Sequence, residues 1–180
     1  MVLFASAFAL VDFSGHRTVA AILGLLTLIG VWLIQLKVVA PSVLGIVIPL
    51  GLVFMAYCSI VILRLVLGRR HVTTHTLYGT IAAYLLLGIF WGVLYNYIAL
   101  IQPGAFYADV AVRPDGILWS DLLHLSLQTI TTVGHARITP VSALAQALVS
   151  LEAVAGVTCI ALLVSRFIAA HRQQAQPARR

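Results

Sequence analysis

The chain has 180 residues, of which 62% are hydrophobic and only 9% are charged, and its formal net charge is +6. This composition excludes an ordinary soluble domain and is typical of an integral membrane chain with one compact unit. The basic residues are scattered at the ends of apolar stretches, so nucleic acid is not expected as a partner. Cys58 and Cys159 both lie inside apolar stretches, which argues against a disulfide framework or a metal cluster.

The first half of the chain predicts a peripheral pair of membrane spans. Residues 1–17 are short and mildly amphipathic and lack the basic start of a cleavable signal peptide, so an interfacial helix is expected. Residues 18–67 contain two apolar stretches, 18–36 and 43–67, each long enough to cross a hydrocarbon core of about 30 Å. Residues 68–76 form a basic loop after this pair.

The second half predicts two further spans on either side of a short helix. Residues 77–101 and 141–170 are the third and fourth spans, and residues 171–180 form a polar tail. Residues 120–130 are too few to cross the membrane, so they are expected to enter it as a helix and stop. The predicted fold is an all-α membrane protein with four transmembrane helices and a re-entrant helix and loop between the third and fourth.

The short helix and the residues after it are the stretch where function is expected. Either Ser120 or Asp121 is expected to cap the start of the helix. Residues 131–134 read Thr-Thr-Val-Gly, and non-helical backbone at membrane depth must be buried in protein or line a watery cavity. One glycine among β-branched residues suits an extended strand whose carbonyl oxygens point one way. Four such strands around an axis replace the water shell of a cation.

The run SLQTITTVGHARITP resembles the pore-loop signature of tetrameric potassium channels, whose filter reads TTVGYGD and is commonly followed by an ITP-like turn. The resemblance covers residues 77–170, which would be a pore domain of outer helix, pore loop and inner helix. It implies a homotetramer similar to the small four-span prokaryotic members of that family. The matching positions are Thr131, Thr132, Val133, Gly134, Ile138, Thr139 and Pro140.

The resemblance implies a filter whose ion-binding groups come from Thr132, Val133, Gly134, His135 and Ala136, with the Thr132 hydroxyl innermost. The bound metal would be K⁺ or another monovalent cation, held by the backbone carbonyls of the first three residues, and no other cofactor is expected. The implied activity is passive cation permeation without a catalytic step. The expected partners are membrane lipid, monovalent cations and other copies of the chain.

Three consecutive residues depart from the family pattern: His135 replaces Tyr, Ala136 replaces Gly and Arg137 replaces Asp. Alanine in a left-handed backbone costs about 1–2 kcal/mol, and four arginines around an outer mouth repel cations. Weakened potassium selectivity is therefore expected. The alternative is a weakly selective or non-conducting pore fold that acts as a membrane scaffold or interaction partner. His135 either makes conduction pH-dependent or packs behind the strand, and Arg137 either faces the mouth or turns to Asp109, Asp115 or lipid phosphate.

Several other residues are expected to support or gate the filter. Gln128 is expected to bond the filter backbone, and Thr131 adjoins it. Glu152, the only acid inside a predicted span, either pairs with His124 or Gln128 or takes part in gating. Gly156 is either a hinge, as the resemblance implies, or a small-residue packing contact. The residues expected to line a cavity are Val157, Ile160 and Val164.

The distribution of basic residues predicts the orientation in the plasma (inner) membrane. With both termini cytoplasmic, more basic residues lie inside than outside, as membrane proteins prefer. Those inside are Arg17, Arg64, Arg69, Arg70, Arg166, Arg172, Arg179 and Arg180, and those outside are Lys37, Arg113 and Arg137. The pore loop then enters from the outer face.

Overall fold

The structure is a computed structural model, and it is mostly helical. It describes residues 22, 24–30, 32–33, 44–68, 74–108, 116–134 and 137–175. The expected interfacial segment, much of the first expected span, residues 69–73 of the basic loop and the end of the tail lie outside the described residues.

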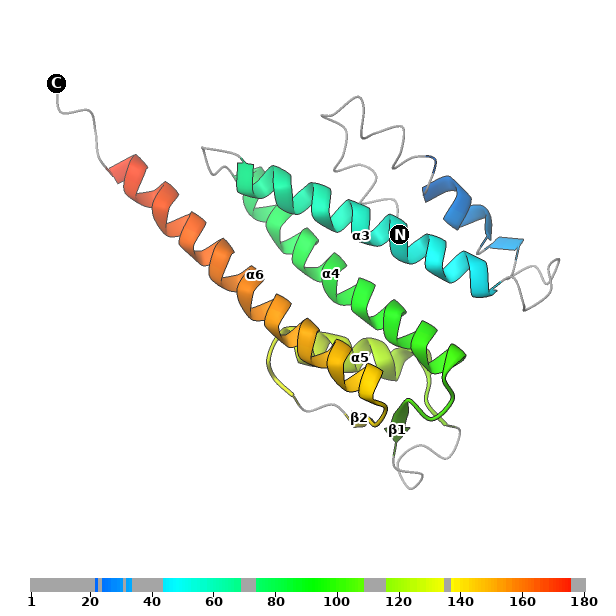
Figure 1. Ribbon diagram of the computed structural model, residues 1–180. Coiled ribbons are helices and arrows are strands. Elements are labelled where there is room, and N and C mark those ends of the chain that lie inside the picture. Colours follow the sequence, from blue (N-terminus) through cyan, green and yellow to red (C-terminus); the bar gives the residue numbers. More distant parts are fainter. Residues whose placement is uncertain are drawn as a thin grey trace.

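The described elements follow the order expected from the sequence (Figure 1). They are α3 (Leu44–Gly68), α4 (Thr74–Ile101), β1 (Phe106–Ala108), α5 (Trp119–Ile130), β2 (Ile138–Pro140) and α6 (Ala143–Ala175). The bounds differ most at the end of α6, which continues as helix to Ala175 although the polar tail was expected to begin at residue 171. The two strands were not expected, because each has only three residues.

Two helical segments among the described residues are long and apolar enough to cross a membrane. They are Ile81–Ile101 and Ala143–Ser165, with 21 and 23 residues, and Gly45–Val61 is a shorter apolar segment. The two long segments coincide with the third and fourth expected spans. At 1.5 Å per residue, the 33 residues of α6 extend over about 50 Å, so this helix is longer than a hydrocarbon core of about 30 Å.

Helix α4 lies at the centre of the arrangement, with α3 on one side and α5 and α6 on the other (Figure 1). The contact between α3 and α4 is an apolar cluster that includes Phe54, Met55 and Cys58 of α3 and Ala83 and Leu86 of α4. Cys58 is completely buried there, and Cys159 of α6 is buried as well.

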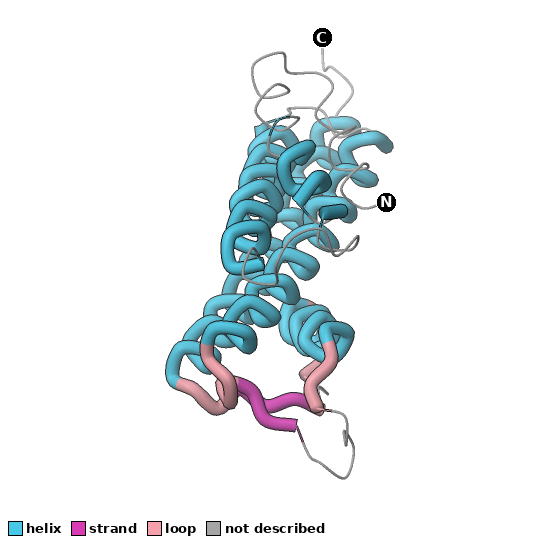
Figure 2. The backbone as a smooth tube through the Cα atoms, turned by 90° about the vertical axis from the view of Figure 1, so that its right-hand side faces the viewer, coloured by secondary structure: helices cyan, strands magenta, loops and turns pink. Residues whose placement is uncertain are grey.

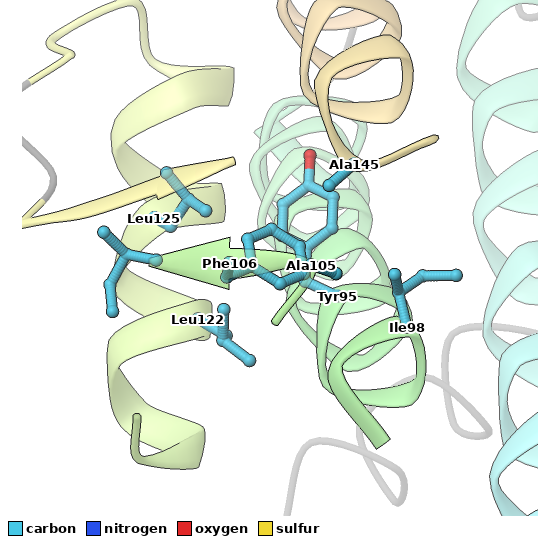
Figure 3. Close-up of a cluster of buried hydrophobic side chains, with 8 residues drawn as sticks. Tyr95, Ile98, Ala105, Phe106, Leu122, Leu125 and Ala145 are labelled. Carbon is cyan, nitrogen blue, oxygen red and sulfur yellow. The ribbon is translucent and has the colours of Figure 1, made fainter. Parts of the chain in front are cut away.

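A second apolar core joins α4, α5 and α6 to the strands (Figure 3). At its centre, the rings of Tyr95 and Phe106 lie 5.6 Å apart at an interplanar angle of 56°. The Tyr95 hydroxyl points towards α6 (Figure 3). The other buried members are Ile98, Ala105, Leu122, Leu125, Ile138 and Ala145.

The two strands tie the chain that leaves α4 to the chain that enters α6. They pair antiparallel, with Phe106 opposite Pro140, and lie beyond one end of the helices (Figure 2). The N–H groups of Val141 and Ser142 then donate to the Ala105 carbonyl at 2.9 and 3.2 Å. This pairing anchors the segment that follows α5 at its far end.

Candidate functional site

Helix α5 begins one residue earlier than the sequence predicted, and neither expected residue is its N-cap. The N-cap is Leu118, which has an extended backbone with φ −90° and ψ 157°. Asp121 is the third helical residue, and its carboxylate accepts the Leu118 N–H at 3.0 Å. A leucine side chain cannot cap a helix, so Asp121 supplies only the reciprocal half of a capping box. Ser120 is exposed.

Two glycines on α4 let α5 approach closely. A Cβ on Gly92 would lie 3.0 Å from the Cα of Leu123 and 2.8 Å from its Cδ1. A Cβ on Gly88 would lie 2.9 Å from Leu127 Cδ2. Because the two glycines are four residues apart, they lie on one face of α4. That face therefore forms a shallow seat for α5.

The C-terminal end of α5 is held from both sides. The carbonyl of Ile130 accepts the Tyr84 hydroxyl of α4 at 2.6 Å. From α6, a Cβ on Gly156 would lie only 2.5 Å from the same carbonyl oxygen. Helix α6 runs without interruption through Gly156. The structure therefore shows a small-residue packing contact at Gly156, and a hinge role for this glycine stays a prediction.

The residues after α5 fold back on its last turn. The N–H groups of Val133 and Gly134 both donate to the main-chain carbonyl of Gln128, at 2.9 and 3.2 Å. Each N–H shares a planar trans peptide with the preceding carbonyl, which points the opposite way. The carbonyls of Thr132 and Val133 therefore both point away from Gln128. Residues 131–134 are all exposed.

This fold-back depends on an alternating backbone. Thr132 has φ +61° and Gly134 has φ +72°, while Val133 between them keeps a negative φ. Such alternation turns successive N–H groups to one side, as in the backbone nests that bind anions. A left-handed conformation costs about 1–2 kcal/mol for a residue with a Cβ. The strain at β-branched Thr132 marks this segment as a functional candidate.

The outer part of the expected filter is only partly described. His135 and Ala136 lie outside the described residues. Arg137, where the description resumes, is exposed and directly precedes β2. The 131–134 segment thus lies between a fixed helix end at Ile130 and a strand that begins at Ile138.

Glu152 of α6 is completely buried against α5. One carboxylate oxygen contacts the Ser126 hydroxyl of α5 at 2.5 Å, and the other accepts the Tyr95 hydroxyl of α4. The sequence predicted that Glu152 would pair with His124 or Gln128 of the short helix. Its partner on that helix is instead Ser126, and His124 and Gln128 contact each other at 3.3 Å. The reason is geometric: Ser126 lies on the buried face of α5, whereas His124 is exposed.

The other predicted site residues have these positions. Thr131 ends α5, and its hydroxyl donates to the Leu127 carbonyl at 2.6 Å. Gln128 is half-buried, and the bonds to the 133–134 backbone described above use its main-chain carbonyl. The expected cavity-lining residues are all exposed on α6 in the single chain, and they are Val157, Ile160 and Val164.

Three residues of this site were missed by the sequence reasoning: Ser126, Tyr95 and Tyr84. A signal existed for Ser126, because it lies four residues from both Leu122 and Ile130 and so shares their buried face. No comparable signal marked Tyr95 as a partner of Glu152 or Tyr84 as a partner of the end of the short helix.

Comparison with known proteins gives one family. A family model described as "Ion channel" matches residues 80–173, which include most of α4, both strands, α5, the 131–134 segment and most of α6. No curated protein and no solved structure gave a match.

Proposed function

The chain belongs to the ion-channel family, and on that premise we propose that it forms a homotetrameric, potassium-channel-like pore through which monovalent cations pass passively. The proposed protein has four spans in the plasma (inner) membrane and both termini in the cytoplasm. The bias of basic residues towards one side supports this orientation.

The observation that carries the proposal is the parallel direction of the Thr132 and Val133 carbonyls. The N–H groups of the same two peptides, those of Val133 and Gly134, donate to the Gln128 carbonyl. The two carbonyl oxygens are therefore presented together on the opposite side. Cation filters are rings of such backbone carbonyls, which replace the hydration shell of the ion. The alternating φ angles of Thr132 and Gly134 are the local reason that the carbonyls align.

One chain supplies one row of carbonyls, so a ring needs several copies. In the single chain, Val133 is 54% exposed and Val157 is 53% exposed. A fourfold arrangement around the carbonyl row places four 132–134 segments at the axis. In that arrangement the exposed stripe of Val157, Ile160 and Val164 lines the cavity below the filter.

Selectivity is proposed to be weaker than in the family that the sequence resembles. The inner sites, built from Thr132 and Val133, keep the family residues. The outer sites depend on Ala136, whose Cβ disfavours a left-handed backbone, and they lie beside the exposed charge of Arg137. Fewer ordered carbonyl rings give less discrimination between potassium and sodium.

Flux into liposomes tests this proposal. The purified protein is reconstituted, and uptake of rubidium, as a potassium substitute, is compared with uptake of sodium. We expect uptake of both with a modest preference for rubidium, and a larger preference in the triple variant His135→Tyr, Ala136→Gly, Arg137→Asp. The single changes Ala136→Gly and Arg137→Asp separate backbone strain from charge.

Two results would count against the proposal in different ways. Strong rubidium selectivity in the unmodified protein, unchanged in the triple variant, contradicts the argument from strain and charge. An assembled tetramer that passes no cation, with or without the triple change, favours the alternative of a membrane scaffold.

A further inference from the structure

Four polar groups from three helices meet in one buried chain of contacts. The Tyr95 hydroxyl of α4 contacts one carboxylate oxygen of Glu152, and the other oxygen lies 2.5 Å from the Ser126 hydroxyl of α5. The same Ser126 oxygen lies 2.6 Å from the main-chain carbonyl of Gly88 on α4. Glu152, Ser126 and Tyr95 are all fully buried.

The number of hydrogens available to these contacts determines the protonation state of Glu152. There are three contacts, and each needs one hydrogen. Tyr95 and Ser126 carry one hydroxyl hydrogen each, and the Gly88 carbonyl carries none. If Ser126 donates to Gly88, then its 2.5 Å contact with Glu152 requires a hydrogen on the carboxyl group. A carboxylate would leave two acceptor oxygens in contact without a hydrogen between them.

The surroundings of Glu152 also favour the neutral carboxylic acid. Burying an ionised carboxylate is strongly unfavourable unless an opposite charge accompanies it. The partners that the structure gives Glu152 are hydroxyl groups, and no ion pair to it occurs within the described residues. A neutral carboxylic acid satisfies all three contacts with three hydrogens.

We propose that Glu152 is a neutral carboxylic acid that donates its proton to Ser126, and that it positions α5 against α4 and α6. Its role in positioning the filter rests on the pore function proposed above. The hydrogen bonds of Glu152 go to Tyr95 and Ser126, so it is a positioning residue that acts on the 131–134 segment through α5.

The buried contacts of Glu152 lie one helical turn from the contacts that hold the end of α5. Each of its three helices contributes a second residue, four positions away, to the contact that holds the end of α5. The pairs are Gly88 and Tyr84 on α4, Ser126 and Ile130 on α5, and Glu152 and Gly156 on α6. Two layers of contacts are therefore stacked one helical turn apart. The second layer holds Ile130, the last residue before the 131–134 segment.

Replacing Glu152 by glutamine or by leucine distinguishes its hydrogen bonds from its bulk. In Glu152→Gln, one of the two amide N–H groups donates to Ser126 and the amide oxygen accepts from Tyr95, so each of the three contacts keeps its hydrogen. In Glu152→Leu, similar bulk remains but both bonds are lost. We therefore expect Glu152→Gln to keep wild-type thermal unfolding and flux. Glu152→Leu should lose about tenfold in rubidium flux, or in the rubidium-to-sodium ratio, as for the loss of two buried hydrogen bonds that together contribute about 1.4 kcal/mol.

The protonation state is measured directly, because Glu152 is the sole glutamate in the chain. Protein made by cell-free synthesis with glutamate carrying carbon-13 at the side-chain carboxyl gives a single-site NMR and infrared signal in lipid. At neutral pH we expect the signal of a carboxylic acid. A carboxylate signal would overturn the proposal, whatever the flux measurements show.

Two further outcomes test the positioning role of Glu152 and its link to the proposed pore. An acid signal combined with unchanged thermal unfolding and flux in Glu152→Leu would overturn the positioning role. If the wild-type protein passes no cation, the proposed pore function fails, but the isotope signal and the difference in thermal unfolding between the Gln and Leu variants still test this inference.

Discussion

Replacing Gly156 by alanine tests the close contact between α6 and the end of α5. The added Cβ would lie 2.5 Å from the Ile130 carbonyl oxygen, whereas ordinary contacts begin at 3.4 Å. The helices must therefore separate by about 0.9 Å at this point. The neighbour is main chain, already bonded to the Tyr84 hydroxyl, so it cannot rotate away as a side chain does.

Two opposing terms set the size of the effect. Overpacking of this kind costs about 1–3 kcal/mol, and the upper part of that range applies because backbone must move. Alanine regains about 1 kcal/mol of helix propensity over glycine. The expected net loss is about 1–2 kcal/mol of folding stability per chain. Because Ile130 directly precedes the 131–134 segment, we also expect lower cation flux.

The assay compares thermal unfolding and liposome flux of Gly156→Ala with those of Gly45→Ala. Gly45 is also helical, but an added Cβ there meets nothing within 4 Å, so this control is expected to be neutral or slightly stabilising. Wild-type stability of Gly156→Ala would refute the packing argument. Wild-type stability together with altered opening would instead favour the hinge reading.

Three further predictions use the same unfolding measurement. Gly92→Ala is expected to lose up to about 2 kcal/mol net, because its Cβ would meet the α5 backbone at 3.0 Å while alanine regains about 1 kcal/mol of helix propensity, and an unchanged midpoint would contradict the close contact. Asp121→Ala is expected to lose about 0.5–2 kcal/mol through the lost bond to the α5 N-terminus, whereas Ser120→Ala should change nothing; equal effects would show that the capping assignment is wrong. Tyr84→Phe removes the bond to the Ile130 carbonyl and is expected to cost about 0.5–1.5 kcal/mol. When the fold-change in cation flux is converted to a free energy, we expect it to exceed the loss of folding stability for this variant. If neither flux nor stability changed, the bond would not hold the helix end.

The helices could be predicted from the sequence because their signal is one of length and composition. The third and fourth spans and the short helix between them were expected within a few residues of α4, α6 and α5. The antiparallel pair of β1 and β2 was not, because three-residue strands carry too little periodicity to be distinguished from loop. Their pairing joins residues about 30 positions apart.

The site was predicted less completely, because its contacts depend on how three helices are rotated about their axes. The sequence indicated that Glu152 needed a partner on the short helix, but only the rotation of α5 decides between Ser126 and His124. The alternating backbone at Thr132 is likewise invisible in composition, since threonine rarely adopts positive φ. The resemblance of the Thr-Thr-Val-Gly run to a known filter located this segment where local propensity could not.

The most direct test of the proposed pore is a structure of the assembled protein in lipid with thallium or rubidium present. We expect a fourfold ring and cation density on its axis, equidistant from the four Thr132 and four Val133 carbonyl oxygens. An assembly in which these carbonyls face away from the axis, or an axis that holds no cation beside them, would contradict the proposed pore.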